Sequence, residues 1–370
     1  MRNVLKEYGY SDEQVKQKIA DTWRHIFEDE ATKFYHESGD KGFMMDTGND
    51  DARTEGMSYG MMMAVQMNRK DIFDKLWLWS MTYMHHKTGE FEGYFAWHCR
   101  PDGTRIDDGP APDGEEFYAL ALYFASNLWG DGKPPFDYSN QASEIIRAMI
   151  HKGQKPGTGE PMFNNDNKQI LFVPGCPFTD PSYHLPHFYD LIAKWCFPED
   201  KEFMLAAAKA SREYLPAACH PVTGLAPEYA NFDGTPLDIE RRPIAKAHYS
   251  DSYRVALNIG IDALWTGGIG EWSAETAEKI QRFYLSRPDA MTNTVVHIDG
   301  TPYPEEIMHP LAITATAAAI SAARPVNDES GKLIRRFMEA EMRTCKRRYY
   351  DNCLYFFSLL GLSGGYKIID

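Results

Sequence analysis

The stretch SDEQVKQKIADTWRHIF, residues 11–27, carries the clearest structural signal in the chain. It opens with a capping-box pattern, in which Ser11 and Gln14 can satisfy backbone amides at a helix start. Apolar side chains then recur every four residues, at Val15, Ile19, Trp23 and Phe27. This spacing forms one stripe along a helix, and it predicts an amphipathic α-helix.

Helical spacing dominates the rest of the chain as well. It predicts further helices near 54–68, 71–86, 114–128, 138–151, 182–196, 200–216, 250–265, 272–286, 306–323, 330–344 and 347–361. Strand-like alternation is weak, and KQILFVPG (168–175) is the best candidate for a strand. Since no low-complexity linker interrupts the pattern, we expect an all-α fold in a single domain, residues 1–370. Helical hairpins wound into a toroid would suit such a pattern.

Composition and charge narrow the classes of partner. The 370 residues are 43% hydrophobic and 13% aromatic, which is enough for a large core. The net charge is −14, and an acidic surface repels phosphates. We therefore expect neither nucleic acid nor an anionic membrane as a partner. The oligomeric state is not readable from the sequence.

The N-terminus and the cysteines favour the cytoplasm. The stretch MRNVLKEYGYSDEQ (1–14) has no apolar run of the kind found in signal peptides, and no window is apolar enough to span a membrane. The cysteines are scattered without a metal-binding spacing, at Cys99, Cys176, Cys196, Cys219, Cys345 and Cys353. We expect reduced core thiols and a cytoplasmic protein.

Acidic residues open predicted helices at three places, each beside aromatic side chains: Glu55, Asp113 and Asp251. Helix capping explains each of them singly, because acids favour helix starts; Asp113 with Glu116 is such a signature, and Asp251 has Arg254 as a local partner. Taken together, the three acids suggest a catalytic role. Two carboxyl groups flanking a cleft are what glycosidic bond hydrolysis needs, one as acid and one as base or nucleophile.

The loops also carry flat side chains of the kind that stack on sugars. They include GYFAWHC (93–99), SYHLPHFYD (182–190) and RRYYDN (347–352). Trp97, Tyr183 and Tyr350 are the candidates for substrate contact, and the two tyrosines could also position a water molecule. The alternative is that these aromatics fill a helical core, since such rings bury large areas.

Other chemistries find little support. The chain has no G-x-S-x-G elbow, no phosphate-binding loop and no H-E-x-x-H. The histidines His85, His86, His184 and His187 lack a paired acid at metal-ligand spacing, so we expect structural roles for them, no metal and no cofactor. A sugar epimerase would need paired histidines facing a cleft, for which His184, His187 and His248 are weak candidates.

The chain resembles glycoside hydrolase family 8 and, within that family, the group of reducing-end xylose-releasing exo-oligoxylanases. Five motifs carry the resemblance, in the family's order and over nearly the whole chain: RTEGMSYGMMMAVQ (53–66), APDGEEFYALALYFAS (111–126), DPSYHLPHFYDL (180–191), SDSYRVALNIG (250–260) and RRYYDNCLYFFSLLGLSG (347–364).

The resemblance implies an (α/α)6 barrel and hydrolysis with inversion at the anomeric carbon. The family's general acid falls on Glu55 and its general base on Asp251. The acid that binds the distorted sugar falls on Asp113, and an arginine near the base falls on Arg254. Glu55 must then keep its proton at neutral pH, although a helix start favours the charged form, so burial and neighbouring carboxylates have to prevail.

A smaller feature bears on where the enzyme cuts. The stretch YPEEIMHPLAI (303–313) resembles the group's Leu-His-Pro loop, which walls off the leaving-group side of the cleft. His309 would bind the reducing-end hydroxyl, and Met308, a residue of similar size to the expected leucine, would help close the site. Alternatively His309 only precedes a helix at Pro310. The expected substrate is a xylo-oligosaccharide of three or more units.

Two rival readings stay open. One is an endo-acting xylanase, glucanase or chitosanase of the same family, and the other is a non-catalytic sugar-binding protein. The sequence does not decide between xylose and glucose in the central subsite, because one small branch changes the free energy of binding by only about 1–3 kcal/mol.

Overall fold

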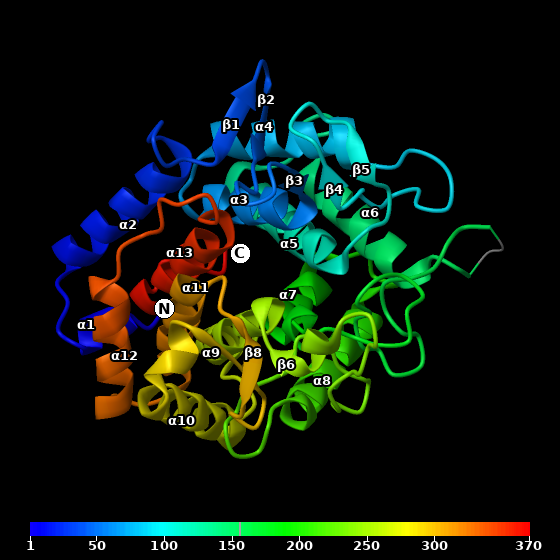
Figure 1. Cartoon of the computed structure of the whole chain (residues 1–370). Coiled ribbons are helices and arrows are strands. Elements are labelled where there is room, and N and C mark those ends of the chain that lie inside the picture. The colour runs from blue at the N-terminus through cyan, green and yellow to red at the C-terminus, as the bar shows by residue number, and fades with distance from the viewer. Residues whose placement is uncertain (155–156) are drawn as a thin grey trace. The chain divides into compact units, whose positions relative to one another are not determined.

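The computed structural model of the chain describes residues 1–154 and 157–370 (Figure 1). The chain forms two compact units, and each is assembled from separate stretches of sequence. Unit 1 comprises Met1–Thr32, Phe178–His187 and Ser211–Lys367. Unit 2 comprises Lys33–Pro177, Phe188–Ala210 and Ile368–Asp370. Helices dominate both units, as the sequence predicts.

Unit 1 is built mainly of helices joined by short turns. Its α-helices are α1 (Val4–Glu7), α2 (Asp12–Phe27), α9 (Arg254–Thr266), α10 (Glu271–Ser286), α11 (Pro310–Ala319), α12 (Asp328–Glu339) and α13 (Tyr349–Ser363). Its 3-10 turns are η2 (Pro181–Tyr183), η3 (Pro243–Lys246), η4 (Ser250–Tyr253), η5 (Pro288–Met291) and η6 (Ile320–Ala323). Its strands are β6 (Ala247–His248), β7 (Thr294–His297) and β8 (Pro302–Glu306).

Unit 2 has the same character. Its helices are α3 (Thr54–Gln66), α4 (Lys70–Trp79), the π-turn η1 (Ser80–Met84), α5 (Pro112–Trp129) and α6 (Tyr138–His151). Its strands are β1 (Tyr35–Ser38), β2 (Lys41–Met44), β3 (Ala52–Arg53), β4 (His98–Cys99) and β5 (Arg105–Asp107). Two of the boundaries between the units fall inside helices, one in α7 (Pro186–Trp195) and one in α8 (Lys201–Ala218).

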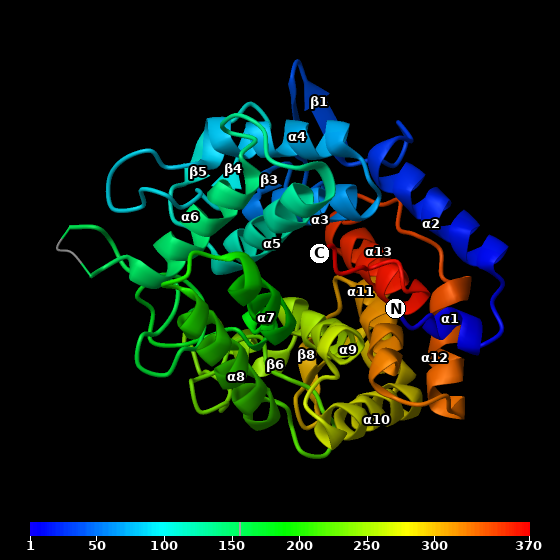
Figure 2. The same cartoon turned by 180° about the vertical axis from the view of Figure 1, so that it is seen from behind.

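Several helices are buried on every side. In α3 nearly all residues after the first turn are buried, and α11, with the sequence PLAITATAAA, and α13 are buried along most of their length. Within unit 2, α3 packs against α5; within unit 1, α11 packs against α13 and α9 (Figures 1 and 2). A helix that is apolar all round belongs to a core, whereas the outer α2 and α12 show one apolar stripe.

The capping box at the start of α2 forms as predicted. The Ser11 side chain accepts from the backbone N–H of Gln14 at 3.2 Å, and the Gln14 side chain accepts from the N–H of Ser11 at 2.9 Å. Val15, Trp23 and Phe27 of the predicted stripe are buried.

Short strands were missed, and the one predicted strand is wrong. Residues 168–175 contain no strand and only an isolated bridge from Ile170 to Phe163. Instead there are three small antiparallel sheets, β1-β2, β3-β4-β5 and β6-β7-β8, among the described residues. Their strands have two to five residues, too few to show alternation. These sheets hold the chain where it enters α3 and where it approaches α11.

Several predicted helix boundaries also need correction; for example, the helix expected at 330–344 ends at Glu339. The helix expected at 306–323 begins only at Pro310, because residues up to Glu306 form β8. The helix expected at 71–86 ends as α4 at Trp79 and continues as the π-turn η1. Proline is well suited to the first turn of a helix, and it marks the true start of α11.

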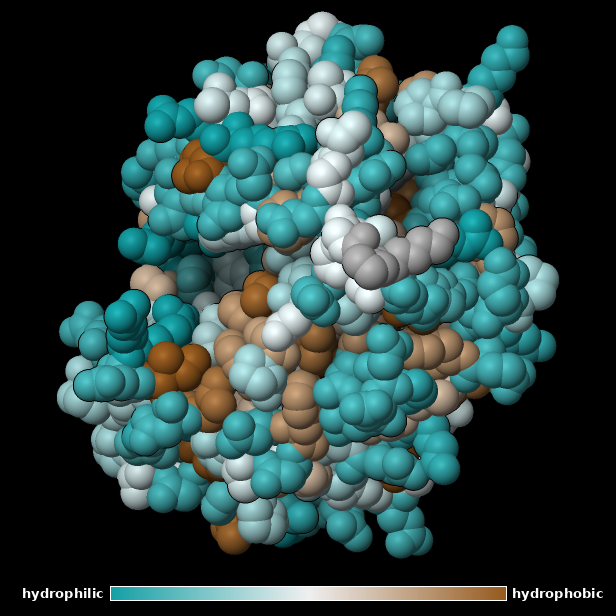
Figure 3. Space-filling view, turned by 90° about the vertical axis from the view of Figure 1, so that its right-hand side faces the viewer, coloured by the Kyte–Doolittle hydropathy of each residue, from teal (hydrophilic) through white to brown (hydrophobic). Residues whose placement is uncertain are grey.

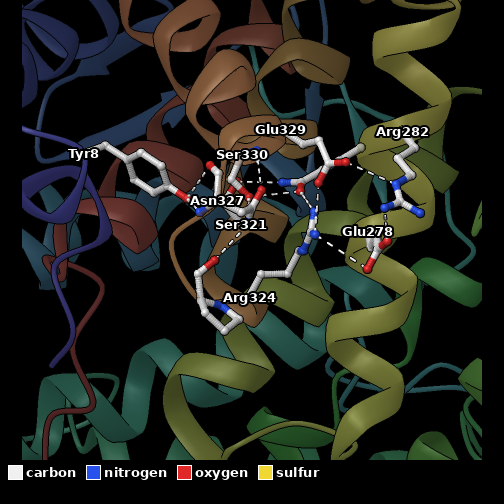
Figure 4. A network of polar contacts seen from close by, with 10 residues as sticks. Tyr8, Glu278, Arg282, Ser321, Arg324, Asn327, Glu329 and Ser330 are labelled. Carbon is white, nitrogen blue, oxygen red and sulfur yellow. Dashed lines mark hydrogen bonds and ion pairs between the residues drawn. The ribbon is translucent and has the colours of Figure 1, made fainter.

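A polar network ties α10 to α12 within unit 1 (Figure 4). Arg324 reaches Glu329 at 3.1 Å and Glu278 at 3.6 Å, and Arg282 of α10 reaches Glu329 at 3.1 Å. The hydroxyl of Tyr8 accepts from the N–H of Asn327 at 3.0 Å. Partly exposed ion pairs stabilise a fold little one by one, but a connected set fixes the register of the two helices.

The surface is largely polar. The face in Figure 3 is covered mostly by hydrophilic residues, with smaller groups of hydrophobic ones between them. In the part of the chain that the structure describes, no helix combines the length and the apolar character needed to cross a bilayer.

Candidate active site

Glu55 lies in the first turn of α3, half-buried. The chain arrives there through β3, which pairs with β4, and the N–H of Thr54 donates to the C=O of Trp97 at 3.0 Å. The N-cap residue Arg53 is extended and makes no side-chain cap. The position of Glu55 is therefore fixed by the paired strands β3 and β4 just before it and by the buried helix α3 that continues after it.

A cation lies next to Glu55. Arg53 contacts Asp51 at 3.0 Å and Asp46 at 3.3 Å, and its guanidinium lies 5.4 Å from the ring centre of Trp97. Burial alone would lower the pKa of Arg53, but Asp51, Asp46 and the nearby Glu55 together raise it. The two aspartates neutralise most of this cation, so its charge is only partly available to Glu55.

Asp113 is buried in the first turn of α5. The N-cap of this helix is Ala111, with no side-chain cap, so the expected capping pair of Asp113 and Glu116 is wrong. Asp113 instead accepts the N–H of Gly114 at 2.9 Å, and Glu116 accepts a hydrogen bond from the hydroxyl of Tyr189. Helix capping thus does not account for this acid.

The starts of α3 and α5 touch at a glycine. A Cβ added to Gly114 would lie 2.4 Å from the Cβ of Thr54, far inside van der Waals contact. Only glycine permits this approach. Within unit 2 it brings the helix starts that carry Glu55 and Asp113 together.

Glu115 is a buried acid that was not among the site residues predicted from the sequence. Its side chain is fully buried and accepts the N–H of Phe95 at 3.0 Å, while Oε2 has no hydrogen-bond partner. Burial, with a smaller effect of Asp113, raises its pKa well above the usual value. Glu115 therefore keeps its proton more readily than a solvent-exposed glutamate does.

Asp251 lies in the 3-10 turn η4, which leads into α9. It is not an N-cap, since those positions are Tyr249 and Tyr253. The preceding Ser250 has a φ of 45°, a region that residues other than glycine rarely adopt. The Asp251 side chain keeps 23% of its surface exposed and reaches Arg254 at 3.3 Å. Strained backbone thus places an accessible carboxylate beside a buried cation.

Arg254 joins Asp251 to the segment around η2. Its Nε donates to Ser182 Oγ at 3.1 Å, Nη2 lies 3.9 Å from Asp180, and its guanidinium lies 5.4 Å from the ring centre of Tyr183. The side chain is 5% exposed. Arg254 and Tyr183 are therefore brought together with Asp251, as the sequence suggested.

Two further acids near Asp251 were missed. Asp180 is fully buried, and burial together with the charge of Asp251 raises its pKa well above the usual value, although Arg254 opposes this. Glu228 is also fully buried and pairs with Arg242 at 2.7 Å. Burial and Asp251 raise the pKa of Glu228 to about 7. DPSYHLPHFYDL contains Asp180, but nothing in the loop 219–236 singles out Glu228.

His309, Met308 and Tyr350 also gather in unit 1. His309 is the residue before α11, and its ring lies 4.9 Å from that of Tyr350. Tyr350 donates from its hydroxyl to the C=O of Ser250 at 3.1 Å. Tyr350 therefore links the His309 loop to the strained turn that carries Asp251.

Three other histidines of unit 1, His184, His187 and His248, are buried in its interior. Burial lowers the pKa of His184 to about 3, and of His187 and His248 to about 4. His184 is bonded on both nitrogens, to Thr179 at 3.0 Å and Ser211 at 2.9 Å. Among the described residues no group of histidine, cysteine and acidic side chains has an arrangement that could hold a metal ion.

The candidate residues thus form two groups. Unit 2 carries Glu55 and Asp113 at adjacent helix starts, with Trp97, just before β4, beside Arg53. Unit 1 carries the others: Asp251, Arg254, Tyr183, Tyr350, His309 and Met308. Acids placed at helix starts, beside aromatic rings and without a metal-ligand set, are what a helical glycosidase requires.

The chain belongs to the family described as glycosyl hydrolases family 8, whose model matches residues 18–362. It is therefore a glycoside hydrolase. It is 53% identical to the reducing end xylose-releasing exo-oligoxylanase of Halalkalibacterium halodurans, over 99% of this chain and 94% of that protein. It is 50% identical to the reducing-end xylose-releasing exo-oligoxylanase Rex8A of Paenibacillus barcinonensis, over 99% of this chain and 96% of that protein.

A solved structure supports the fold. The crystal structure of a reducing-end-xylose releasing exo-oligoxylanase mutant complexed with xylobiose matches with a TM-score of 0.95 and 52% identity, covering 99% of this chain and 97% of that one. The fold class implied by the family resemblance, an (α/α)6 barrel, is confirmed by such matches.

Proposed function

We propose that the protein is an inverting exo-oligoxylanase that releases xylose from the reducing end of β-1,4-linked xylo-oligosaccharides of three or more units. The observation that carries this is the identity of 53% over 99% of the chain with a protein of that name. Endo-acting relatives are more distant: an endoglucanase of Ruminiclostridium josui is 27% identical over 59% of this chain.

In this proposal Glu55 is the general acid and Asp251 the general base. Glu55 protonates the leaving oxygen, while Asp251 takes a proton from the water that attacks the opposite face of the sugar. Support for the base comes from Arg254 at 3.3 Å, which stabilises the carboxylate. Asp113 holds a hydroxyl of the distorted sugar, and its burial at a helix start beside that of Glu55 supports this role.

The exo character of the proposal rests on the loop before α11. His309 receives the reducing-end hydroxyl, and Met308 closes the site beyond it. Trp97, Tyr183 and Tyr350 serve as substrate contacts, and either tyrosine could position the attacking water. The ring contact between His309 and Tyr350 at 4.9 Å supports a loop held in place beside Asp251.

We further propose that residues 1–370 act as one catalytic domain in the cytoplasm. The family match runs through residues of both units, 18–362, which supports a single domain. The cysteines are spread along the chain without the spacing of a disulfide framework, which suits a reducing compartment.

The experiment is a product time course on xylotetraose labelled at its reducing end. Label that appears first in free xylose, beside unlabelled xylotriose, is the expected result. Label that appears first in xylobiose or longer products would mean an endo enzyme. Binding of xylotetraose without any cleavage would point to a sugar-binding protein instead.

A further inference from the structure

We propose that Asp351, held by Arg343, sets the ring of His309 so that Nε2 can only accept a hydrogen bond, which makes a free reducing-end hydroxyl necessary for binding. The inference rests on the proposed function, because it explains how the leaving-group side of the site would recognise a chain end. Asp351 and Arg343 are positioning residues in it, since they act through His309.

Both carboxylate oxygens of Asp351 accept hydrogen bonds. It lies in the first turn of α13 and is fully buried. One oxygen accepts the N–H of Ala312 at 2.9 Å, and the other accepts from Arg343 at 2.5 Å and lies 3.0 Å from His309 Nδ1. Backbone and guanidinium nitrogens can only donate, so an ionised carboxylate fits this place.

Because the carboxylate has no proton to give, Nδ1 of His309 must carry one. A neutral imidazole has a single N–H, so Nε2 then has a lone pair and no hydrogen. Arg343 already supplies the positive charge beside Asp351. The charge of Asp351 raises the pKa of Arg343 despite the burial of its guanidinium.

Arg343 also fixes the loop that carries the histidine. The nitrogen that reaches Asp351 donates to the C=O of Met308 at 2.6 Å. Arg343 itself is held through its backbone, whose N–H and C=O bond to the side chain of Asn352 at 3.0 and 2.9 Å. Residues 351 and 352 at the start of α13 thus position both the ring and the loop.

The chemistry of the chain end follows from this arrangement. A free anomeric hydroxyl has an O–H that can donate to Nε2, whereas a glycosidic oxygen has no hydrogen. The His309 side chain is 13% exposed, so an unmatched Nε2 would lose most of its contact with water on binding. Sites built to hydrogen-bond a substrate hydroxyl reject analogues that lack it far more strongly than apolar pockets reject a methyl group.

The test compares xylotriose with its methyl β-glycoside, which differs only at the anomeric oxygen. We expect kcat/KM of the wild-type enzyme to be at least about 100-fold higher for xylotriose. In Asp351→Ala nothing accepts from Nδ1 at this place, so the proton is free to move to Nε2, and we expect the ratio to fall at least about tenfold, through a rise in KM for xylotriose. The control is Asp262→Asn, which removes a buried acid of α9 that pairs with Arg212 at 2.7 Å. We expect this variant to keep the wild-type ratio of kcat/KM for the two substrates.

A second measurement does not depend on a variant at position 351. Nitrogen-15 NMR of histidine-labelled wild-type enzyme, with the signals of His309 assigned from His309→Asn, should show hydrogen on Nδ1 and none on Nε2. Hydrogen on Nε2 would overturn the inference, as would an unchanged substrate ratio in folded Asp351→Ala. Failure of the wild-type enzyme to cleave xylotriose would instead overturn the proposed function and leave the NMR result to be judged separately.

Discussion

Arg254 lies 3.3 Å from Asp251, three residues earlier in the chain, and the two side chains differ sharply in exposure. The arginine is 5% exposed and the aspartate 23%. The 3-10 turn before α9 therefore presents a carboxylate to solvent while its cation stays inside. This geometry stabilises the charge that Asp251 would need in the proposed role of general base.

The roles of Glu55 and Asp251 can be separated by the leaving group. Glu55→Ala and Asp251→Ala should each lower kcat on xylotriose by roughly 10²–10⁴-fold, the usual contribution of a general acid or base. On β-xylobiosyl fluoride, whose fluoride leaves without needing a proton, Glu55→Ala should retain most activity and Asp251→Ala should not. Product analysis by chromatography measures both.

The matched control is Glu271→Gln, an exposed acid in the first turn of α10. It shares the helix-start position and should keep wild-type kcat. If Glu55→Ala kept near-wild-type turnover on xylotriose, its assignment as the acid would be wrong.

Removing Arg254 should weaken catalysis without unfolding the chain. A hydrogen bond to a charged group contributes about 1.5–3 kcal/mol, so Arg254→Ala should lower kcat by roughly 10- to 100-fold. Arg254→Lys keeps the charge but loses the fork that also donates to Ser182, so an intermediate kcat is expected. Arg212→Ala, which breaks the ion pair with Asp262, is the control for general destabilisation. Equal losses of kcat in the Arg254→Ala and Arg212→Ala variants would argue against a specific role for Arg254.

Glu228 should make stability depend on pH. Its pKa of about 7 in the folded chain lies above its ordinary value of 4.5, because of burial and the charge of Asp251. The folded state then binds the proton more tightly than the unfolded state. The associated stability is present below about pH 4.5 and is lost as the pH rises through about 7.

Glu228→Gln removes this titration. Relative to the wild type, its free energy of unfolding should rise by about 2–3 kcal/mol between pH 5 and pH 8, at about 1.4 kcal/mol per pH unit over the two or so units in which the folded state alone keeps the proton. Urea denaturation at both pH values measures it. Parallel changes in the two proteins would mean that Glu228 is not protonated in the folded chain at pH 5.

Some acids of the candidate site could be predicted from the sequence, and others could not. Glu55, Asp113 and Asp251 were found because acids before apolar helical segments are visible in one dimension, and the family motifs gave them roles. Asp180 and Glu228 could not be found in this way. Their significance comes from burial near Asp251, which depends on chain segments about 20 to 70 residues away.

The same limit applies to the fold. Helix periodicity located α2 and its capping box, whereas the start of α11 was placed four residues too early, at Glu306, because PYPEE precedes an apolar run without a visible break. The ion pair between Arg343 and Asp351 was equally hidden, since neither residue belongs to a pattern of its own. Contacts set by packing have no local signature.

Replacing Gly114, where α5 meets α3, should lower both the stability of the fold and kcat. Gly114→Ala would place a Cβ 2.4 Å from the Cβ of Thr54 and 3.2 Å from its backbone carbonyl carbon, so α5 would have to move. Overpacking of this kind destabilises by about 1–3 kcal/mol, and kcat should fall because Glu55 follows Thr54 directly.

The comparison variant is Gly60→Ala, also on α3. Its Cβ would meet the flexible side chain of Met44 at 2.7 Å, which can move aside, and alanine is the better helix former. We therefore expect a smaller loss of stability and little change in kcat. Thermal denaturation and xylotriose turnover for both variants decide the matter. If Gly114→Ala kept wild-type kcat, the close approach of α5 to Thr54 would not be what holds Glu55 in place for catalysis.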